Sequence, residues 1–208
     1  MDWAAWHADY DSDTPLRRRL EMVQGHIRTF LDECDRSPVT VISMCAGEAR
    51  DLLGAVASVT RRDLKGCLVE LDPGLAAVAR RGCEALGLDG IEVVVGDAGH
   101  SSAYVGAVPA DLVLACGVFG NIDDADVERT VRAMASMCAT GGTAIWTRHR
   151  REPDLTPAIR RWFTQSGFTE LAFNEVPGGP ASVGAAQYTG ETKPLLDQKL
   201  FMFTRTAP

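Results

Sequence analysis

Short apolar runs alternate with stretches of helical spacing along most of this 208-residue chain. Each run is too short for a helix, and the five clearest occupy 39–44, 66–71, 91–95, 111–115 and 143–147. Between them, apolar residues recur at steps of three and four, which marks one face of a helix. Continuous apolar strands separated by helices are typical of a parallel sheet that helices cover on both faces. The pattern therefore predicts an α/β fold with a doubly wound, mostly parallel sheet.

Capping signals set the limits of the predicted elements. Thr14-Pro15 offers a helix cap followed by proline, and Ser37-Pro38 ends that helix. We expect residues 1–37 to form a helical preface and residues 38–208 to form the α/β unit, within one structural domain. Further helices are expected over 49–59, 73–86, about 127–138 and 156–167. The last two strands, at 168–173 and 199–204, are expected to pair antiparallel across a loop from 175 to 198.

The charge balance and the cysteines narrow the function classes. The 21 Lys and Arg residues and 28 Asp and Glu residues give a net charge of −7, whereas dedicated nucleic-acid binders usually carry a basic surface. The six cysteines form no C-x-x-C pair, and no His pair completes a zinc site, so no metal is expected. The acidic, aromatic start does not read as a signal peptide, and no apolar stretch is long enough to span a bilayer. We expect a soluble cytoplasmic protein with reduced cysteines and without nucleic-acid or membrane partners.

Three loops at the carboxyl ends of predicted strands hold the candidate binding residues. Ligands of doubly wound sheets bind at this edge. The first loop, 43–51, contains Gly47 and small neighbours that let the backbone approach a ligand, although a G-x-G-x-x-G fingerprint is absent. Glu70 closes the next strand, at the distance of about 20 residues where a carboxylate accepts from a ribose diol. Asp97 closes the third and could accept from an adenine amine. Taken singly, each feature also fits a tight turn or a solvated strand end.

In this combination the chain resembles the class I S-adenosylmethionine-dependent methyltransferases, which have a seven-stranded Rossmann-like fold with an antiparallel last strand. The resemblance covers residues 38–205 and implies S-adenosyl-L-methionine as cofactor, with S-adenosyl-L-homocysteine as product. Two features depart from the family pattern: Ser43 stands where the family usually has an acid, and Cys45 and Ala49 replace glycines. Glu48, Arg50 or Asp51 could then contribute to binding the methionine end. The implied cofactor-binding residues are Ser43, Cys45, Ala46, Gly47, Arg50, Glu70, Leu71, Asp97, Ala98 and Cys116.

Candidates for catalysis and acceptor binding lie near both ends of the chain. A base is needed only if the acceptor must lose a proton, and His149 and His7 are the candidates, each also readable as a solvated histidine. The expected acceptor-binding residues are Trp3, Trp6, Tyr10, Phe119, Asn121 and Arg148. The aromatic residues at the start would act as a lid or merely staple the preface to the core. Five arginines lie close together, Arg148, Arg150, Arg151, Arg160 and Arg161. The first three would face an anionic acceptor or, on the favoured interpretation, form a solvated helix entry that neutralises Glu152 and Asp154.

The predicted function is methyl transfer to an O, N or C atom of a small-molecule acceptor. The alternatives are a non-catalytic protein that binds the nucleotide as a sensor or partner, and a nicotinamide-dependent oxidoreductase, which the missing G-x-G-x-x-G disfavours. Asp123, Asp124 and Asp126 leave a metal-dependent O-methyltransferase open but are more simply read as charges at a helix start. The sequence leaves monomer and homodimer open.

Overall fold

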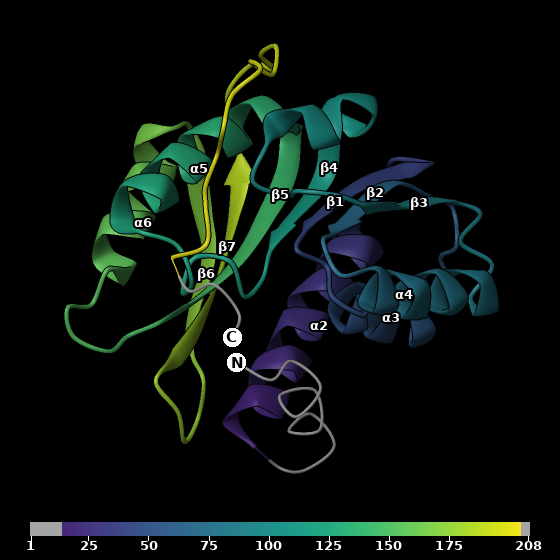
Figure 1. Cartoon of the computed structure of the whole chain (residues 1–208), viewed down its shortest axis with the longest axis horizontal. Helices are drawn as coiled ribbons and strands as arrows, with labels where there is room; N and C mark the ends of the chain where they lie inside the picture. The colour runs from purple at the N-terminus through teal and green to yellow at the C-terminus, as the bar shows by residue number, and fades with distance from the viewer. Residues whose placement is uncertain (1–13, 205–208) are drawn as a thin grey trace.

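Seven strands form one mixed sheet in the order β3-β2-β1-β4-β5-β7-β6 (Figure 1). The computed structural model describes residues 14–204. The strands β1 to β5 run parallel, and β7 is antiparallel to both of its neighbours, β5 and β6. The predicted fold class is therefore confirmed. The strands are β1 (Val39–Met44), β2 (Leu64–Glu70), β3 (Gly90–Val95), β4 (Ala110–Ala115), β5 (Cys138–His149), β6 (Phe168–Glu175) and β7 (Ala181–Tyr188).

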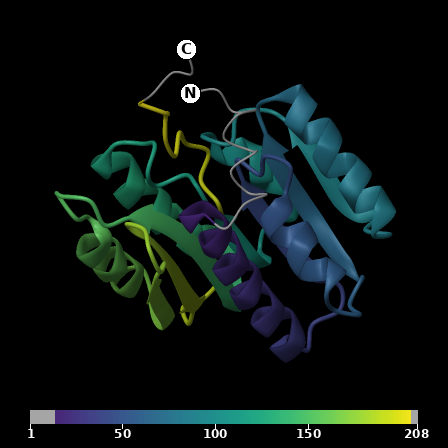
Figure 2. The ribbon, with the colours of Figure 1, turned by 90° about the horizontal axis from the view of Figure 1, so that it is seen from below.

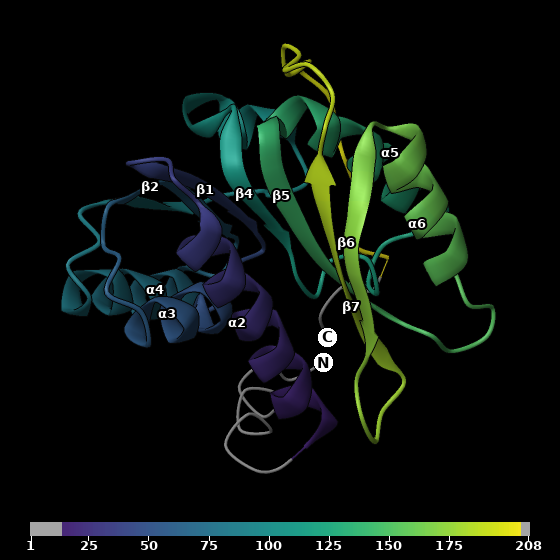
Figure 3. The ribbon, with the colours of Figure 1, turned by 180° about the vertical axis from the view of Figure 1, so that it is seen from behind.

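Helices cover both faces of the sheet, as Figures 2 and 3 show from below and from behind. They are α2 (Pro15–Glu33), α3 (Arg50–Ala57), α4 (Pro73–Ala85), α5 (Asp124–Met137) and α6 (Thr156–Gln165), with a 3₁₀ helix η1 (Ser101–Ala107). The apolar faces of α2, α3 and α4 share one core cluster, and those of η1, α5 and α6 share the other. Strand β1 contributes to both core clusters, because Val41 faces the first cluster and Ile42 faces the second.

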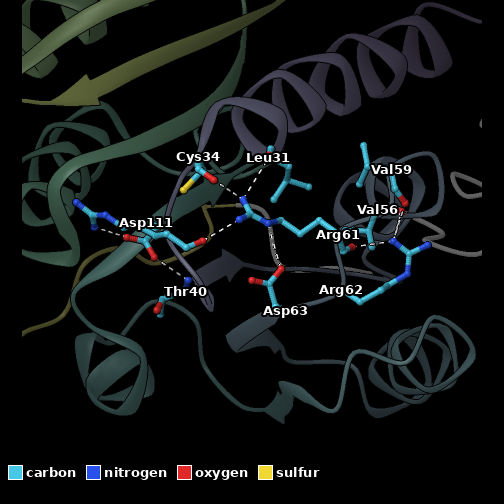
Figure 4. A network of polar contacts seen from close by, with 10 residues as sticks. Leu31, Cys34, Thr40, Val56, Val59, Arg61, Arg62, Asp63 and Asp111 are labelled. Carbon is cyan, nitrogen blue, oxygen red and sulfur yellow. Dashed lines mark hydrogen bonds and ion pairs between the residues drawn. The ribbon is translucent and has the colours of Figure 1, made fainter.

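The helix α2 begins at its predicted cap and ends earlier than predicted. The Thr14 hydroxyl oxygen accepts from the Arg17 amide at 3.2 Å, and Pro15 occupies the first helical position. The helix stops at Glu33 rather than at Ser37-Pro38. Figure 4 shows why: the Arg61 guanidinium donates to the carbonyls of Leu31 (3.0 Å) and Cys34 (2.6 Å), which satisfies the end of the helix.

The polar network of Figure 4 lies at the amino ends of the strands. Arg61 is also paired with Asp63 at 3.1 Å, and the Asp111 carboxylate accepts from the Thr40 amide at 2.8 Å and from Arg36. These contacts join α2, β1, β2 and β4 at the edge opposite the strand ends where ligands bind. The network therefore supports the fold and leaves the other edge for a binding site.

The prediction of the last strand at 199–204 is wrong. The strand that pairs between β5 and β6 is β7, inside the stretch predicted as a loop. Its small residues carry no strong strand signal, but the sheet requires them: a Cβ at Gly184 would lie 2.2 Å from Trp146 Cε2. The segment 199–204 instead makes only isolated bridges, from Lys199 to His100 and from Phe203 to Ile122. The 3₁₀ helix η1 was not predicted either.

Among the helices that the structure describes, none combines the length and the apolar character needed to cross a membrane.

Candidate functional site

The carboxyl ends of β1 to β5 share one edge of the sheet, and the loops that follow them form the candidate site. The loop after β1 runs from Cys45 to Ala49 and leads into α3. Glu70 is the last residue of β2, and Asp97 follows β3. Residues 116–123 connect β4 to α5, and His149 ends β5. The fold therefore brings the predicted cofactor residues to one edge.

The loop after β1 keeps a glycine-type backbone although it contains one glycine. Cys45, Gly47 and Ala49 all have left-handed conformations, with φ of 51°, 58° and 56°. The Ala46 amide donates to the Val69 carbonyl at 2.9 Å, and the Ala49 amide donates to the Ala46 carbonyl at 2.8 Å. L-residues adopt this conformation at a cost that glycine avoids. The loop therefore holds a left-handed backbone at two residues that are not glycine, Cys45 and Ala49.

Glu70 fastens this loop to the second strand. Its Oε2 accepts from the Gly47 amide at 2.7 Å, and its Oε1 accepts from the Asp72 amide at 2.9 Å. A carboxylate has about four acceptor positions, so roughly two remain for hydroxyl donors of a ligand. Leu71 follows with 69% of its surface exposed, an apolar side chain beside the carboxylate. This pair fits a ribose diol and an adjoining flat base.

Asp97 and Ala98 begin the next loop, and both are already used in shaping it. Asp97 is exposed, and its Oδ1 accepts from the Gly99 amide at 2.8 Å. Ala98 is buried, and its carbonyl accepts from the Tyr104 hydroxyl at 2.6 Å. The Tyr104 hydroxyl, on η1, thus fixes the loop that carries the Asp97 carboxylate.

A buried carboxylate lies where α3 meets the end of β4. Asp51, in the first turn of α3, is 9% exposed, and its Oδ1 accepts from the Leu52 amide at 2.8 Å. Burial raises the pKa of Asp51, against the hydrogen bond from Leu52 and the nearby charge of Arg19 on α2. Burial and the Asp51 charge raise the pKa of the neighbouring Cys116 thiol. Ser43, the residue in the usual place of an acid, is 2% exposed within β1.

Arg50 links the loop after β1 to the helix α2. The Arg50 Nε pairs with Glu48 Oε2 at 2.5 Å, and the Arg50 carbonyl accepts from the Gln24 amide group at 2.8 Å.

Burial, with the charges of Glu70 and Asp97, raises the pKa of the Cys45 thiol far above its ordinary range. The thiol is therefore protonated at neutral pH and is no nucleophile.

The loop after β4 is held by polar contacts that the sequence did not reveal. The Gly117 amide donates to Thr147 Oγ1 at 2.8 Å, and the Asn121 side-chain amide donates to the Gly117 carbonyl at 2.7 Å. Arg148 donates to the Phe119 carbonyl and lies 3.7 Å from Asp124, while burial lowers its pKa. Thr147 had no distinguishing sequence signal. Only the pairing of β4 with β5 places its hydroxyl beside Gly117.

Apart from Arg148, the residues predicted for catalysis and acceptor binding divide into three groups. Phe119 is fully buried against Trp146, with ring centroids 6.1 Å apart, so it belongs to the core and not to an open wall. Asn121 and His149 are half-buried at the site, and a Cβ at Gly120 would lie 3.7 Å from His149 Cδ2. Trp3, Trp6, His7 and Tyr10 lie outside the described residues.

The arginines after β5 do not form one anion-binding face. Arg150 pairs with Glu175 at 2.8 Å. Arg160 makes two bonds to Glu170, at 2.6 and 2.7 Å, and stacks 4.7 Å over the Phe173 ring. These partners lie on β6, so Arg150 and Arg160 neutralise that strand's acids, whereas the expected charge of Asp154 acts on Arg148.

The three aspartates at the start of α5 have separate roles. Asp123 Oδ1 accepts from the Asp126 amide at 2.8 Å and caps the helix. Asp124 faces Arg148, and Asp126 accepts from the Met202 amide at 2.8 Å. Within residues 14–204, no group of three or more His, Cys, Asp or Glu side chains is arranged to hold a metal ion.

Comparison with solved structures defines the fold family. No family profile matches the sequence, and no curated protein matches it. The magnesium protoporphyrin IX methyltransferase of Synechocystis, solved with bound S-adenosylhomocysteine, matches with a TM-score of 0.68 at 10% identity, covering 89% of this chain and 93% of that one. The chain has the class I methyltransferase fold. At this identity the likeness establishes the fold alone.

Two further structures show the same fold in longer chains. An O-methyltransferase family protein from Burkholderia thailandensis matches with a TM-score of 0.61 at 16% identity, over 82% of this chain and 57% of that one. A protein from Bordetella parapertussis described as a possible exported protein gives 0.62 at 19% identity, over 80% and 67%. The chain thus spans little more than half of the Burkholderia protein and two thirds of the Bordetella protein.

Proposed function

We propose that this protein is a methyltransferase that uses S-adenosyl-L-methionine and acts on a small-molecule acceptor. The observation that carries the proposal is the loop after β1, in which three alternate residues keep the left-handed backbone and the Gly47 amide binds Glu70. This conformation persists at Cys45 and Ala49, where it costs energy. The substituted glycines were the one support for a non-catalytic nucleotide-binding protein, and the left-handed backbone at Cys45 and Ala49 weakens that support.

The adenosine half of the cofactor would be held by the second and third loops. Glu70 would accept from the ribose hydroxyls with its remaining acceptor positions. Leu71 would pack on the base, and Asp97 with the Ala98 backbone would bind the adenine edge. The small residues of the first loop, including Ala46, let the backbone approach the ligand. No metal is part of this proposal.

The amino-acid half of the cofactor would be held without the acid that the family usually places at Ser43. Asp51 is a buried carboxylate two residues after the substituted loop, and Arg19 lies close enough for its charge to act on Asp51. We assign the ammonium group to Asp51 with the Cys116 backbone, and the carboxylate group to Arg19. Arg50 would then act by fixing the loop to Glu48 and α2.

The acceptor would enter beside the loops that follow β4 and β5. When bound, the cofactor supplies a methyl group on a cationic sulfur, and an in-line displacement depends mainly on positioning. Asn121 and Arg148 shape this side through their bonds to the Gly117 and Phe119 carbonyls. His149 would take a proton from an acceptor that must lose one. We further propose a cytoplasmic protein in which residues 1–37 include a lid over the site.

A thermal-shift series tests the cofactor. A ligand at about 100 times its Kd stabilises a protein by roughly 2.7 kcal/mol, or about 5–10 °C for a domain of this size. We expect shifts with S-adenosylmethionine and S-adenosylhomocysteine and none with NAD. A shift with NAD alone would favour the oxidoreductase, and flat curves with all three would overturn the proposal.

Methylthioadenosine, which lacks the amino-acid group, tests the assignment of Asp51. Asp51→Asn should weaken S-adenosylmethionine at least about tenfold, as expected for loss of a charge-assisted hydrogen bond. It should leave methylthioadenosine unchanged. Glu92→Gln, an exposed acid on β3, is the matched control. Equal loss for both ligands would mean that Asp51 only supports the fold.

A further inference from the structure

The chain does not end with its last strand. After β7 it returns along the α5 side of the sheet without regular secondary structure, as the yellow trace in Figure 1 shows. We call its final described part, Gln198–Thr204, the C-terminal strap. Leu200 and Phe201 of the strap are buried in the core, with 0% and 2% of their surfaces exposed. The strap is therefore a fixed part of the molecule, lying across the edge where the site is found.

One end of the strap is bonded to the loop that carries Asp97. The Gln198 amide donates to Ser101 Oγ at 2.8 Å, and the Ser101 amide donates back to the Gln198 carbonyl at 3.0 Å. The Leu200 amide donates to the Gly99 carbonyl at 2.7 Å. The contact is so close that a Cβ at Gly99 would lie 2.4 Å from the Phe201 carbonyl oxygen. This loop therefore has its shape partly from the strap.

The other end is bonded to the loop that carries Asn121. The Thr204 amide and hydroxyl both donate to the Asn121 carbonyl, at 2.9 and 3.1 Å. Phe203 forms a bridge with Ile122. Asn121 in turn holds the Gly117 carbonyl, next to Cys116 at the end of β4. The strap thus reaches the acceptor side of the proposed site.

Between the two ends, Asp126 of α5 holds the strap. Its Oδ2 accepts from the Met202 amide at 2.8 Å, and its Oδ1 pairs with Arg129. Asp126 is 8% exposed, so its carboxylate is held within the fold at the place where it accepts from the Met202 amide. The neighbouring Thr130 hydroxyl lies 3.3 Å from the Leu200 carbonyl and adds a second contact from the same helix.

We propose that the C-terminal strap couples the adenine-binding loop to the acceptor-side loop, and that Asp126 is the positioning residue that sets this coupling. The assignment of the loops rests on the proposed function, whereas the bonds that join them do not. A ligand that orders the loop at Asp97 would order the loop at Asn121 through the strap. By thermodynamic reciprocity, an acceptor would strengthen adenosine binding by the same factor.

Amide hydrogen exchange of the full chain tests the connection without any ligand. Asp126→Ala should speed exchange about tenfold in both 97–101 and 117–122, because the strap loses the acceptor of its Met202 amide. Glu128→Ala, which breaks the exposed pair with Arg132 on the same helix, should change neither. Asp126→Asn keeps an oxygen that can accept from Met202 and should restore most of the protection. Faster exchange confined to 198–204 would overturn the proposal.

Adenosine, which can reach only the Glu70 and Asp97 side, tests the coupling. Its binding should protect 117–122 in the wild type and not in Asp126→Ala. Equal protection in both would overturn the coupling. If adenosine fails to bind the wild type, the proposed function fails, and exchange without ligand still decides the strap. If Asp126→Ala does not fold, Thr204→Pro removes the amide donor to Asn121 and should abolish the protection of 117–122.

Discussion

Ala49→Gly tests the strain in the loop after β1, because Ala49 carries a left-handed backbone that glycine adopts freely. Ala49 has φ 56° and ψ 30° and is fully buried. The substitution releases about 1–2 kcal/mol of backbone strain. It costs about 0.8 kcal/mol for the buried methyl and about 0.4–1 kcal/mol for the freer unfolded chain. These terms cancel to within about 1 kcal/mol, so we expect little change in the free energy of unfolding.

Ala55→Gly is the matched control. Ala55 lies in α3, is fully buried in the same core cluster and has an ordinary helical backbone. Its replacement loses the methyl and about 1 kcal/mol of helix propensity, for a total near 1.8 kcal/mol. Urea unfolding followed by the fluorescence of buried Trp146 measures both variants. Equal destabilisation by the two substitutions would refute the strain, and with it the interpretation of the loop.

Three further predictions follow from single side chains. Glu70→Ala leaves the Gly47 and Asp72 amides without their acceptor and should lower the free energy of unfolding by about 2–4 kcal/mol in urea unfolding. The control Glu92→Ala, at an exposed position, should change the free energy of unfolding by less than about 0.5 kcal/mol. Because burial raises the pKa of Asp51 in the folded state, its ionisation opposes folding above its unfolded pKa. Asp51→Asn should therefore raise Tm at pH 7. The gain in Tm should shrink as the pH falls through the folded pKa of Asp51 toward the ordinary aspartate range. A gain in Tm that does not depend on pH would contradict this prediction. Arg61→Ala removes donors from the Leu31 and Cys34 carbonyls and should lower the free energy of unfolding by about 1–2 kcal/mol. The Kd of S-adenosylhomocysteine should stay unchanged. Weaker binding would contradict the separation of the two edges of the sheet.

The sequence predicts the five parallel strands because each contains a short, mainly apolar run. Buried strands of this kind are distinguished by composition alone, and capping signals such as Asp72-Pro73 mark the helices between them. The strand β7 was not predicted because its small residues are required by packing against the neighbouring strand β5. Gly184 leaves room for the Trp146 ring, a contact between residues far apart in the chain. Such a constraint is invisible before the strands are paired.

The candidate site was predictable where position along the chain decides it. Glu70 and Asp97 follow directly from the strand ends. The assignments near β4 and β5 depend on where side chains point: Phe119 turns into the core, and Arg148 bonds to a backbone carbonyl beside it. The roles of Thr147 and Asp126 emerged only from tertiary contacts, since each side chain accepts from a backbone amide of a distant segment.

The central claim is that this edge of the sheet binds S-adenosylmethionine through Glu70. Calorimetric titration of S-adenosylhomocysteine into the wild type and into Glu70→Gln tests it directly, because glutamine retains one oxygen and disturbs the loop less than alanine. We predict one site per chain in the wild type and binding at least about tenfold weaker in Glu70→Gln, as expected for the loss of charge-assisted bonds to the ribose. The same affinity in both proteins, or no binding to the wild type, would contradict the account.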